Sequence, residues 1–237
     1  MKSYRRFQIL LIVVLSLTLP GGSGIGHAQQ DWEKIPYQRW GKDEVKAVLE
    51  ASPWSRLDER GTALAPMMFG KDTIKVSENL LVLLRSALPV RQALLRERQL
   101  ESKYDTMSAT DRAAFDAKNK ALLECPACAK HYVISIKCPH LSCYTGTFIE
   151  DHKKFFYLVN DKGERRAMAG ATPLPGKEGS AVFFFPRAND KGEPLLTPDS
   201  KEMTFHFMIQ SNVGLREVSE KFKFDVTKMV RGVEVVF

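Results

Sequence analysis

The spacing of apolar residues in the first half of the chain predicts helices. Between residues 40 and 54, Val45, Val48 and Leu49 recur at helical intervals, so one face of this segment is apolar. Proline disfavours helical geometry in the residue before it, and Pro53 therefore ends this helix. The pattern is typical of a short amphipathic helix that packs on a core.

Two further helices are predicted in this half. Pro89 suits the first turn of a helix that runs to about Lys103, because a first-turn residue has no use for the amide hydrogen that proline lacks. Ser108 and Asp111 have the spacing of a variant capping box. The alanine-rich segment that follows them predicts a helix to about Leu123.

The second half of the chain changes to the alternation typical of strands. Residues 221–226 alternate polar with apolar side chains, so one face is solvated and the other buried, which suits antiparallel strands. In the first half, residues 73–84 predict a strand followed by a buried segment, and residues 55–70 show no period and predict a loop. The strands predicted in the second half are residues 132–136, 155–159, 181–185, 204–209, 221–226 and 233–237.

An internal repeat supports the antiparallel arrangement. The sequence Asn-Asp-Lys-Gly-Glu occurs at residues 160–164 and again at residues 189–193, each time after an apolar aromatic stretch. Tight hairpin turns favour this composition because glycine adopts positive φ without a steric penalty. A calcium-binding loop is the alternative, but neither copy has the full register of acidic ligands that such a loop requires. Hairpin turns are therefore the preferred interpretation.

These patterns predict an α+β fold, with a helical N-terminal part followed by an antiparallel β sandwich or sheet. The 237 residues, 44% of them apolar, are enough to bury a sizeable core. We expect a signal peptide over residues 1–28 and a mainly helical region over 29–124. A cysteine-rich connector over 125–143 and an antiparallel β region over 144–237 complete the expected organisation.

The first 28 residues have the composition of a cleavable signal peptide. Lys2, Arg5 and Arg6 precede an apolar run that is too short to span a bilayer. Gly26 and Ala28 supply small residues for cleavage after Ala28, and an uncleaved anchor is the alternative. Cleavage removes those three basic residues and lowers the formal charge from +7 to +4. We expect a periplasmic or secreted protein with no transmembrane anchor after cleavage.

All four cysteines lie close together, at Cys125, Cys128, Cys138 and Cys143. Structural disulfides are the preferred interpretation because the count is even and the expected compartment is oxidising. We expect cross-links between the first pair and the second pair, and no cofactor. Zinc held by the four thiolates is one alternative. Thiol–disulfide chemistry at Cys125 and Cys128 is the other.

The sequence contains no motif of a serine hydrolase, a zinc protease or a phosphate-binding loop. Its densest basic group is Arg91, Arg96 and Arg98, which Glu97 and Glu101 dilute, so a solvated helix face is predicted rather than a nucleic-acid site. We therefore expect a binding or structural module of the cell envelope without enzymatic activity. Its expected partner is another envelope protein or a ligand, and not a nucleic acid. A zinc-binding or thiol–disulfide protein that uses the cysteine cluster is the alternative.

Five short blocks of the chain together point to one group of proteins. The blocks are residues 40–54, Ser86 to Leu94, Cys125 to Cys128, Phe185 to Arg187, and Lys221 through Met229 to Val236. In these blocks the chain resembles a group of uncharacterised bacterial exported proteins. The resemblance implies export and a shared fold, and it assigns no activity and no catalytic residue.

Overall fold

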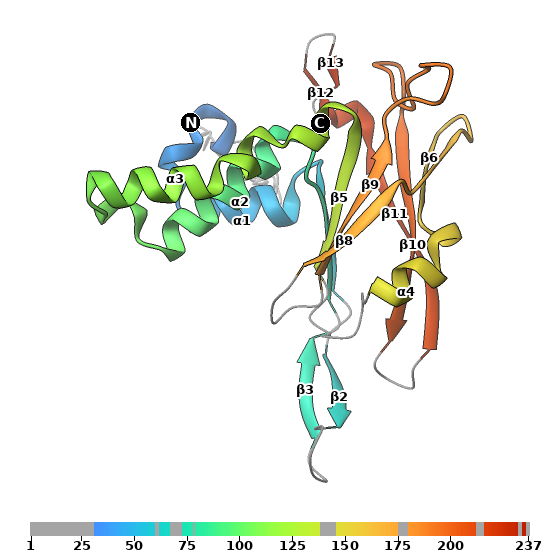
Figure 1. Ribbon diagram of the computed structural model, residues 1–237, viewed down its shortest axis with the longest axis horizontal. Coiled ribbons are helices and arrows are strands. Elements are labelled where there is room, and N and C mark those ends of the chain that lie inside the picture. Colours follow the sequence, from blue (N-terminus) through green and yellow to red (C-terminus); the bar gives the residue numbers. More distant parts are fainter. Residues whose placement is uncertain are drawn as a thin grey trace, which may run out of the picture.

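The structure has three layers: a helical layer, a five-stranded sheet and a four-stranded sheet (Figure 1). This computed structural model describes residues 31–59, 62–66, 73–77, 79–137, 146–174, 180–211, 216–231 and 234–235. Figure 1 shows the long helices on one side of the five-stranded sheet and the four-stranded sheet on its other side. Both large sheets are antiparallel, so the predicted α+β fold is confirmed.

Three helices form the helical layer, at the three places where the sequence predicts them. Two of them begin with side chains that accept from backbone amides. Gly41 N donates to Glu44 Oε2 over 2.8 Å, and Asp111 N donates to Ser108 Oγ over 3.1 Å. The helices are α1 (Lys42–Ala51), α2 (Leu88–Glu101), α3 (Ala109–Glu124) and, beside the sheets, the short α4 (Gly146–Asp151). Single 3₁₀ turns are η1 (Asp31–Lys34), η2 (Tyr37–Arg39), η3 (Tyr104–Thr106), η4 (Pro126–Ala129), η5 (Lys153–Phe155) and η6 (Val226–Met229).

The five-stranded sheet combines strands from both halves of the chain. In spatial order its strands are β1 (Ser55–Asp58), β4 (Leu80–Leu84), β5 (His131–Lys137), β9 (Ser180–Pro186) and β8 (Gly170–Leu174). A separate hairpin consists of β2 (Thr62–Pro66) and β3 (Thr73–Ser77). The loop prediction for residues 55–70 is wrong where β1 and β2 lie, and residues 60–61 and 67–70 are outside the described ranges. Strands of four or five residues are too short to show a period, and their partners β4 and β3 decide their conformation. The five-stranded sheet thus includes β1 and β4, from the part expected to be mainly helical.

The four-stranded sheet contains three of the six strands predicted in the second half. In spatial order they are β11 (Arg216–Asp225), β10 (Glu202–Ser211), β6 (Tyr157–Asn160) and β7 (Arg165–Ala167). Strand β6 begins two residues later than predicted, because η5 occupies the preceding segment. Near the C-terminus, β12 (Val230–Arg231) pairs with β13 (Glu234–Val235). The other residues of the predicted strand 233–237 lie outside the described ranges.

The two large sheets pack face to face through phenylalanine rings. The Phe183 ring of β9 lies 4.9 Å from the Phe156 ring and 5.9 Å from the Phe205 ring of β10, between ring centroids. All three side chains are fully buried. Successive side chains of a strand point to opposite faces, so Phe184 of β9 points toward the helical side. Strand β9 therefore presents one face to the sandwich core and the other to the helices.

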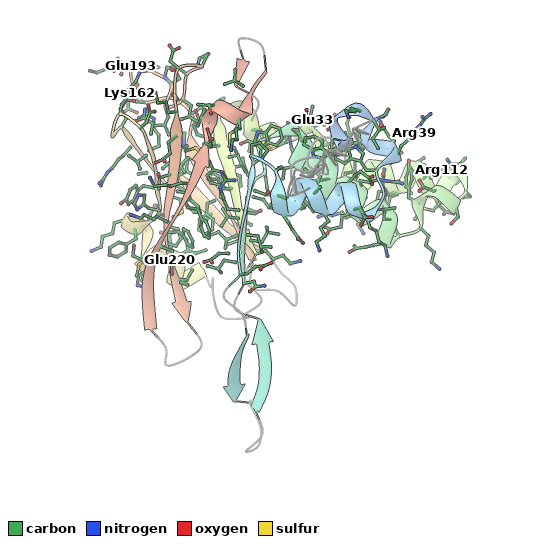
Figure 2. The ribbon with its side chains drawn as sticks, turned by 180° about the vertical axis from the view of Figure 1, so that it is seen from behind. Glu33, Arg39, Arg112, Lys162, Glu193 and Glu220 are labelled. Carbon is green, nitrogen blue, oxygen red and sulfur yellow. A yellow bond between two sulfur atoms is a disulfide. The ribbon has the colours of Figure 1, made fainter. Side chains whose placement is uncertain are left out.

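Both copies of the repeat form tight turns, which confirms the hairpin prediction. Asn160 Oδ1 accepts hydrogen bonds from two backbone amides at 3.0 and 2.9 Å, and Asn189 Oδ1 does the same at 3.0 and 2.9 Å. The glycine of each copy has positive φ, 83° and 82°. These asparagine oxygens are thus occupied by backbone amides, which favours a turn over a calcium loop. Figure 2 shows Lys162 and Glu193, one from each turn, at the same end of the sandwich.

Within the part of the chain that the structure describes, no helix is long and apolar enough to cross a membrane. Residues 1–28 lie outside the described ranges. The signal peptide, its cleavage after Ala28 and the periplasmic or secreted location therefore stay predictions.

The opposite orientations of two neighbouring phenylalanines provide a test of this fold. We expect Phe183→Ala to lower the free energy of unfolding by about 3–5 kcal/mol, because it leaves a cavity between the sheets. Phe184→Ala is the matched control and should cost only about 1 kcal/mol, because this side chain is partly exposed on the other face. Urea denaturation of both variants measures the difference. Equal losses would show that β9 does not have the register described.

Candidate functional site

A disulfide lies where the helical layer meets the five-stranded sheet. Helix α3 ends at Cys125, whose backbone is left-handed with a φ of 44°, and η4 then leads into β5 (Figure 1). This turn brings the Cα atoms of Cys125 and Cys128 to 5.3 Å, and their sulfurs are bonded. The amide of Cys128 donates to the carbonyl of Cys125 over 2.8 Å. Cys125 is partly exposed, whereas Cys128 is only 6% exposed.

The expected cross-links from this pair to Cys138 and Cys143 are not what the structure has, because Cys125 and Cys128 bond to each other. The reason is local, since the 3₁₀ turn of η4 already places these two residues within disulfide distance. Cys138 and Cys143 lie outside the described residues. Among the described residues, no group of three or more His, Cys, Asp or Glu could hold a metal ion. The zinc alternative needs all four thiolates and stays a prediction.

The short loop makes this disulfide a weak staple. Its two cysteines are three residues apart, so the chain-entropy model gives a stabilisation of roughly 2 kcal/mol. Cross-links to the second pair would close longer loops and contribute about 3 kcal/mol on the same model. On this model the short loop contributes less stability than the expected longer loops would.

Two arginines from distant parts of the chain hold the disulfide turn in place. Arg187, directly after β9, donates from Nε to the carbonyl of Cys128 over 2.8 Å, and its guanidinium lies 5.0 Å above the Tyr132 ring. Arg91 of α2 donates from Nη1 to the carbonyls of Leu123 and Glu124, at 2.5 and 3.2 Å. These carbonyls belong to the last turn of α3, where no helical amide remains to bond them. Three of the sequence blocks that carry the resemblance thus meet at this turn.

A shallow groove of about 240 Å³ lies beside the disulfide on the outer face of the five-stranded sheet. Its floor is a small apolar cluster, separate from the main core, in which Cys128, Val133 and Val182 are buried and Phe184 packs against them. Cys125 is one of the residues at the surface of the groove. The lining residues are Arg85, Arg91, Ala121, Leu122, Cys125, Val133, Thr172, Val182 and Phe184.

The groove is positively charged. Burial lowers the pKa of the Arg91 guanidinium, and the charge of Arg187 lowers it further. Burial likewise lowers the pKa of Arg85, with a smaller contribution from Arg98. Arginine nevertheless stays protonated at neutral pH. Arg91 Nε is buried and has no hydrogen-bond partner among the described residues. No acidic side chain is among the residues that line the groove.

A second cavity, of about 530 Å³, lies among η2, α2, η3 and α3, and its polar groups bind one another. Arg96, only 5% exposed, donates to both carboxylate oxygens of Asp105 at 3.0 and 2.8 Å, and its Nε donates to the carbonyl of Trp40 over 2.8 Å. Tyr104 Oη donates to Asp116 over 2.8 Å. The prediction that Arg96 lies on a solvated helix face is wrong, because α2 turns this residue toward η2 and η3. Because these polar groups bond one another, the cavity is best explained as a feature of packing within the helical layer.

A third cleft, of about 540 Å³, borders the tryptophans at the start of the described chain. The Trp32 ring meets the Trp40 and Trp54 rings edge to face, with centroids 5.6 and 6.2 Å apart. Trp40 Nε1 donates to the carbonyl of Trp32 over 3.0 Å. All three side chains are at least 95% buried, so they anchor the core.

The sequence identified the cysteines of the candidate site but missed its arginines. Nothing in the spacing of Arg85, Arg91 and Arg187 distinguishes them from other basic residues, because their meeting depends on the pairing of β5 with both β4 and β9. A weak signal was the position of Arg187 at the end of an apolar strand. Comparison with family models, curated proteins and solved structures gave no match for this chain. The resemblance to bacterial exported proteins therefore stays a prediction.

The ion pair between Arg96 and Asp105 makes the stability of the helical layer depend on pH. Hydrogen bonds from Arg96 are the main cause that lowers the pKa of Asp105. A lowered pKa means that Asp105 contributes stability above its ordinary pKa of about 3.9, and that this contribution is lost as the pH falls through the folded value. We expect Asp105→Asn to reduce the free energy of unfolding by about 1 kcal/mol at pH 7, because the carboxylate is largely exposed to solvent.

Urea denaturation of wild type and Asp105→Asn from pH 7 to pH 3 measures this effect. The difference between the free energies of unfolding of wild type and Asp105→Asn should be constant down to about pH 4 and should become smaller below it. Asp161→Asn, at an exposed turn position, is the control and should change little. A difference that stays constant to pH 3 would contradict the role assigned to the ion pair.

Proposed function

We propose that this protein is an exported binding module of the cell envelope. In this proposal the groove beside the disulfide holds an extended segment of a partner protein that carries apolar side chains and carboxylates. The observation that supports it is the combination of an apolar floor from β5 and β9 with two arginines and no acid in the lining.

The apolar floor supports the hydrophobic part of the proposal. Val133 and Val182 are 4% and 6% exposed, and Phe184 beside them is partly exposed. Covering the remaining apolar area of Phe184 would stabilise a complex by about 25 cal/mol per Å². Small-molecule pockets usually measure roughly 300–1,000 Å³. A shallow groove of about 240 Å³ suits a few side chains of a polypeptide better than a cofactor.

The two arginines support the acidic part of the proposal. A guanidinium donates two parallel hydrogen bonds to a carboxylate, and such pairs strengthen when water is excluded. Arg91 lines the groove and brings its positive charge to it, although its Nη1 is bound to the carbonyls of Leu123 and Glu124. Arg85 lines the same groove. A partner segment with a carboxylate would therefore be preferred over a basic one.

The envelope location rests on the first 28 residues, whose basic start, apolar run and small residues near Ala28 support export. We expect the protein recovered from outside the cytoplasm to begin at Gln29, as N-terminal sequencing or intact mass would measure. A recovered chain that still begins at Met1 would contradict cleavage and favour the uncleaved anchor.

Synthetic peptides test the binding proposal. Three labelled octapeptides are compared by fluorescence anisotropy with the purified protein: valine alternating with glutamate, valine alternating with lysine, and serine alternating with glutamate. We expect the valine–glutamate peptide to bind at least about ten-fold more tightly than the others, because only it meets both the apolar floor and the arginines. Phe184→Ala should weaken its binding by about ten-fold.

Phe155→Ala is the matched control, because Phe155 is 37% exposed but lies on η5, away from the groove. It should leave the affinity unchanged. Arg85→Gln should reduce the preference for glutamate over lysine. Equal binding of all three peptides, or no binding by any of them, would refute the proposal.

A further inference from the structure

The two cysteines of the disulfide differ in exposure. Cys125 lies at the surface of the groove and is partly exposed, whereas Cys128 is 6% exposed in the cluster beneath it. In thiol–disulfide exchange the attacking thiolate must reach a sulfur directly. Solvent-borne thiols can therefore reach Cys125 and are kept from Cys128.

The charges around the bond favour thiolates. Arg85 and Arg91 share the groove with Cys125, and Arg187 binds the carbonyl of Cys128. Nearby cations lower the pKa of a cysteine and attract an incoming thiolate. The C-terminal end of α3 has the opposite effect, since its carbonyls carry partial negative charge. Arg91 offsets that effect directly by donating to the last two carbonyls before Cys125.

The buried sulfur is placed to keep a proton after the bond opens. The carbonyl of Arg85 lies 3.9 Å from Cys128 Sγ. In the oxidised protein this sulfur carries no hydrogen, but a Cys128 thiol could donate to that oxygen. Burial also raises the pKa of a thiol, so once the bond has opened the Cys128 sulfur takes up a proton and remains a thiol.

We propose that Cys125–Cys128 is an exchangeable disulfide that oxidises a pair of thiols in another polypeptide, with Cys125 as the attacked sulfur. A substrate thiolate attacks Cys125 Sγ and forms a mixed disulfide, while the Cys125–Cys128 bond breaks and its electron pair moves to Cys128 Sγ. The second substrate thiolate then attacks the substrate sulfur of the mixed disulfide and releases Cys125. The substrate loses two electrons and becomes a disulfide. Cys125 and Cys128 gain those electrons, and the two protons from the substrate thiols.

This reaction requires only an accessible Cys125, so it stands whether or not the groove binds the peptides of the preceding test. Glutathione is the first probe because it is too small to depend on the groove. The purified wild-type protein is incubated with glutathione, alkylated and analysed by peptide mapping, while circular dichroism follows the fold. We expect the bond to open in the folded protein and the glutathione adduct to lie on Cys125.

Three results would overturn the inference: a bond that opens only when the protein unfolds, an adduct on Cys128, or a native link from Cys125 to Cys138 or Cys143. The variants Cys128→Ser and Cys125→Ser each leave one thiol of the turn and are compared for their reaction with 5,5′-dithiobis(2-nitrobenzoate). Peptide mapping separates their signals from those of Cys138 and Cys143. Cys128→Ser should react about ten-fold faster, because its remaining cysteine, Cys125, is partly exposed and shares the groove with Arg85 and Arg91. Equal rates would contradict the inference.

A charge variant separates electrostatics from exposure. Arg85→Gln should slow the reaction of glutathione with the native disulfide by about three-fold, because it removes one cation from the groove. Arg112→Gln, on α3 at the end of the helical layer far from the sheets, is the control and should leave the rate unchanged (Figure 2). Equal slowing by both variants would show that net charge, and not the groove, sets the rate.

Discussion

The pairing of β5 with β9 is the constraint on which both the core and the candidate site depend. Ile134 pairs with Phe183 and both point into the sandwich, whereas Val133 pairs with Phe184 and both point toward the groove. A slip of one residue would exchange these faces. The same register sets Arg187, which follows β9, beside the turn that precedes β5. The residue that fixes the disulfide turn is therefore positioned by the same hydrogen bonds that order the core.

Helix α2 connects this register to the helical layer. At its start Arg91 reaches the last carbonyls of α3, and further along Arg96 reaches the carbonyl of Trp40 and the carboxylate of Asp105. Few of the side chains of α3 are buried, so its packing against α2 contributes little apolar area. The contact from Arg91 consequently has a large share in fixing where α3 ends, and that end determines where Cys125 lies.

The sequence predicts correctly those features that depend on residues close together in the chain. The serine cap of α3, the proline in the first turn of α2 and the asparagine–glycine turns each act within five residues, and the structure contains all of them. The pairing of β1 with β4 could not be read in this way, because it joins segments about 25 residues apart and four-residue strands show no period. The arginines of the site were missed for the same reason. The predicted partner of Cys125 is wrong because the even count and the expected compartment indicate disulfides without deciding their pairing, whereas the 3₁₀ turn of η4 brings Cys125 and Cys128 together.

Arg91 and Arg187 donate to backbone carbonyls, and this choice of acceptor explains how they can hold the turn and also favour the proposed exchange at the disulfide. A carboxylate partner would hold Arg91 or Arg187 equally well, but it would cancel the positive charge near the disulfide. Backbone carbonyls accept the same hydrogen bonds without carrying a net charge, so the guanidinium keeps its full charge while it fixes the backbone. Because these cations are partly buried, solvent screens them less than it would at an open surface. Arg91 and Arg187 thus hold the turn through three hydrogen bonds and, through their own charges, place a positive potential near Cys125.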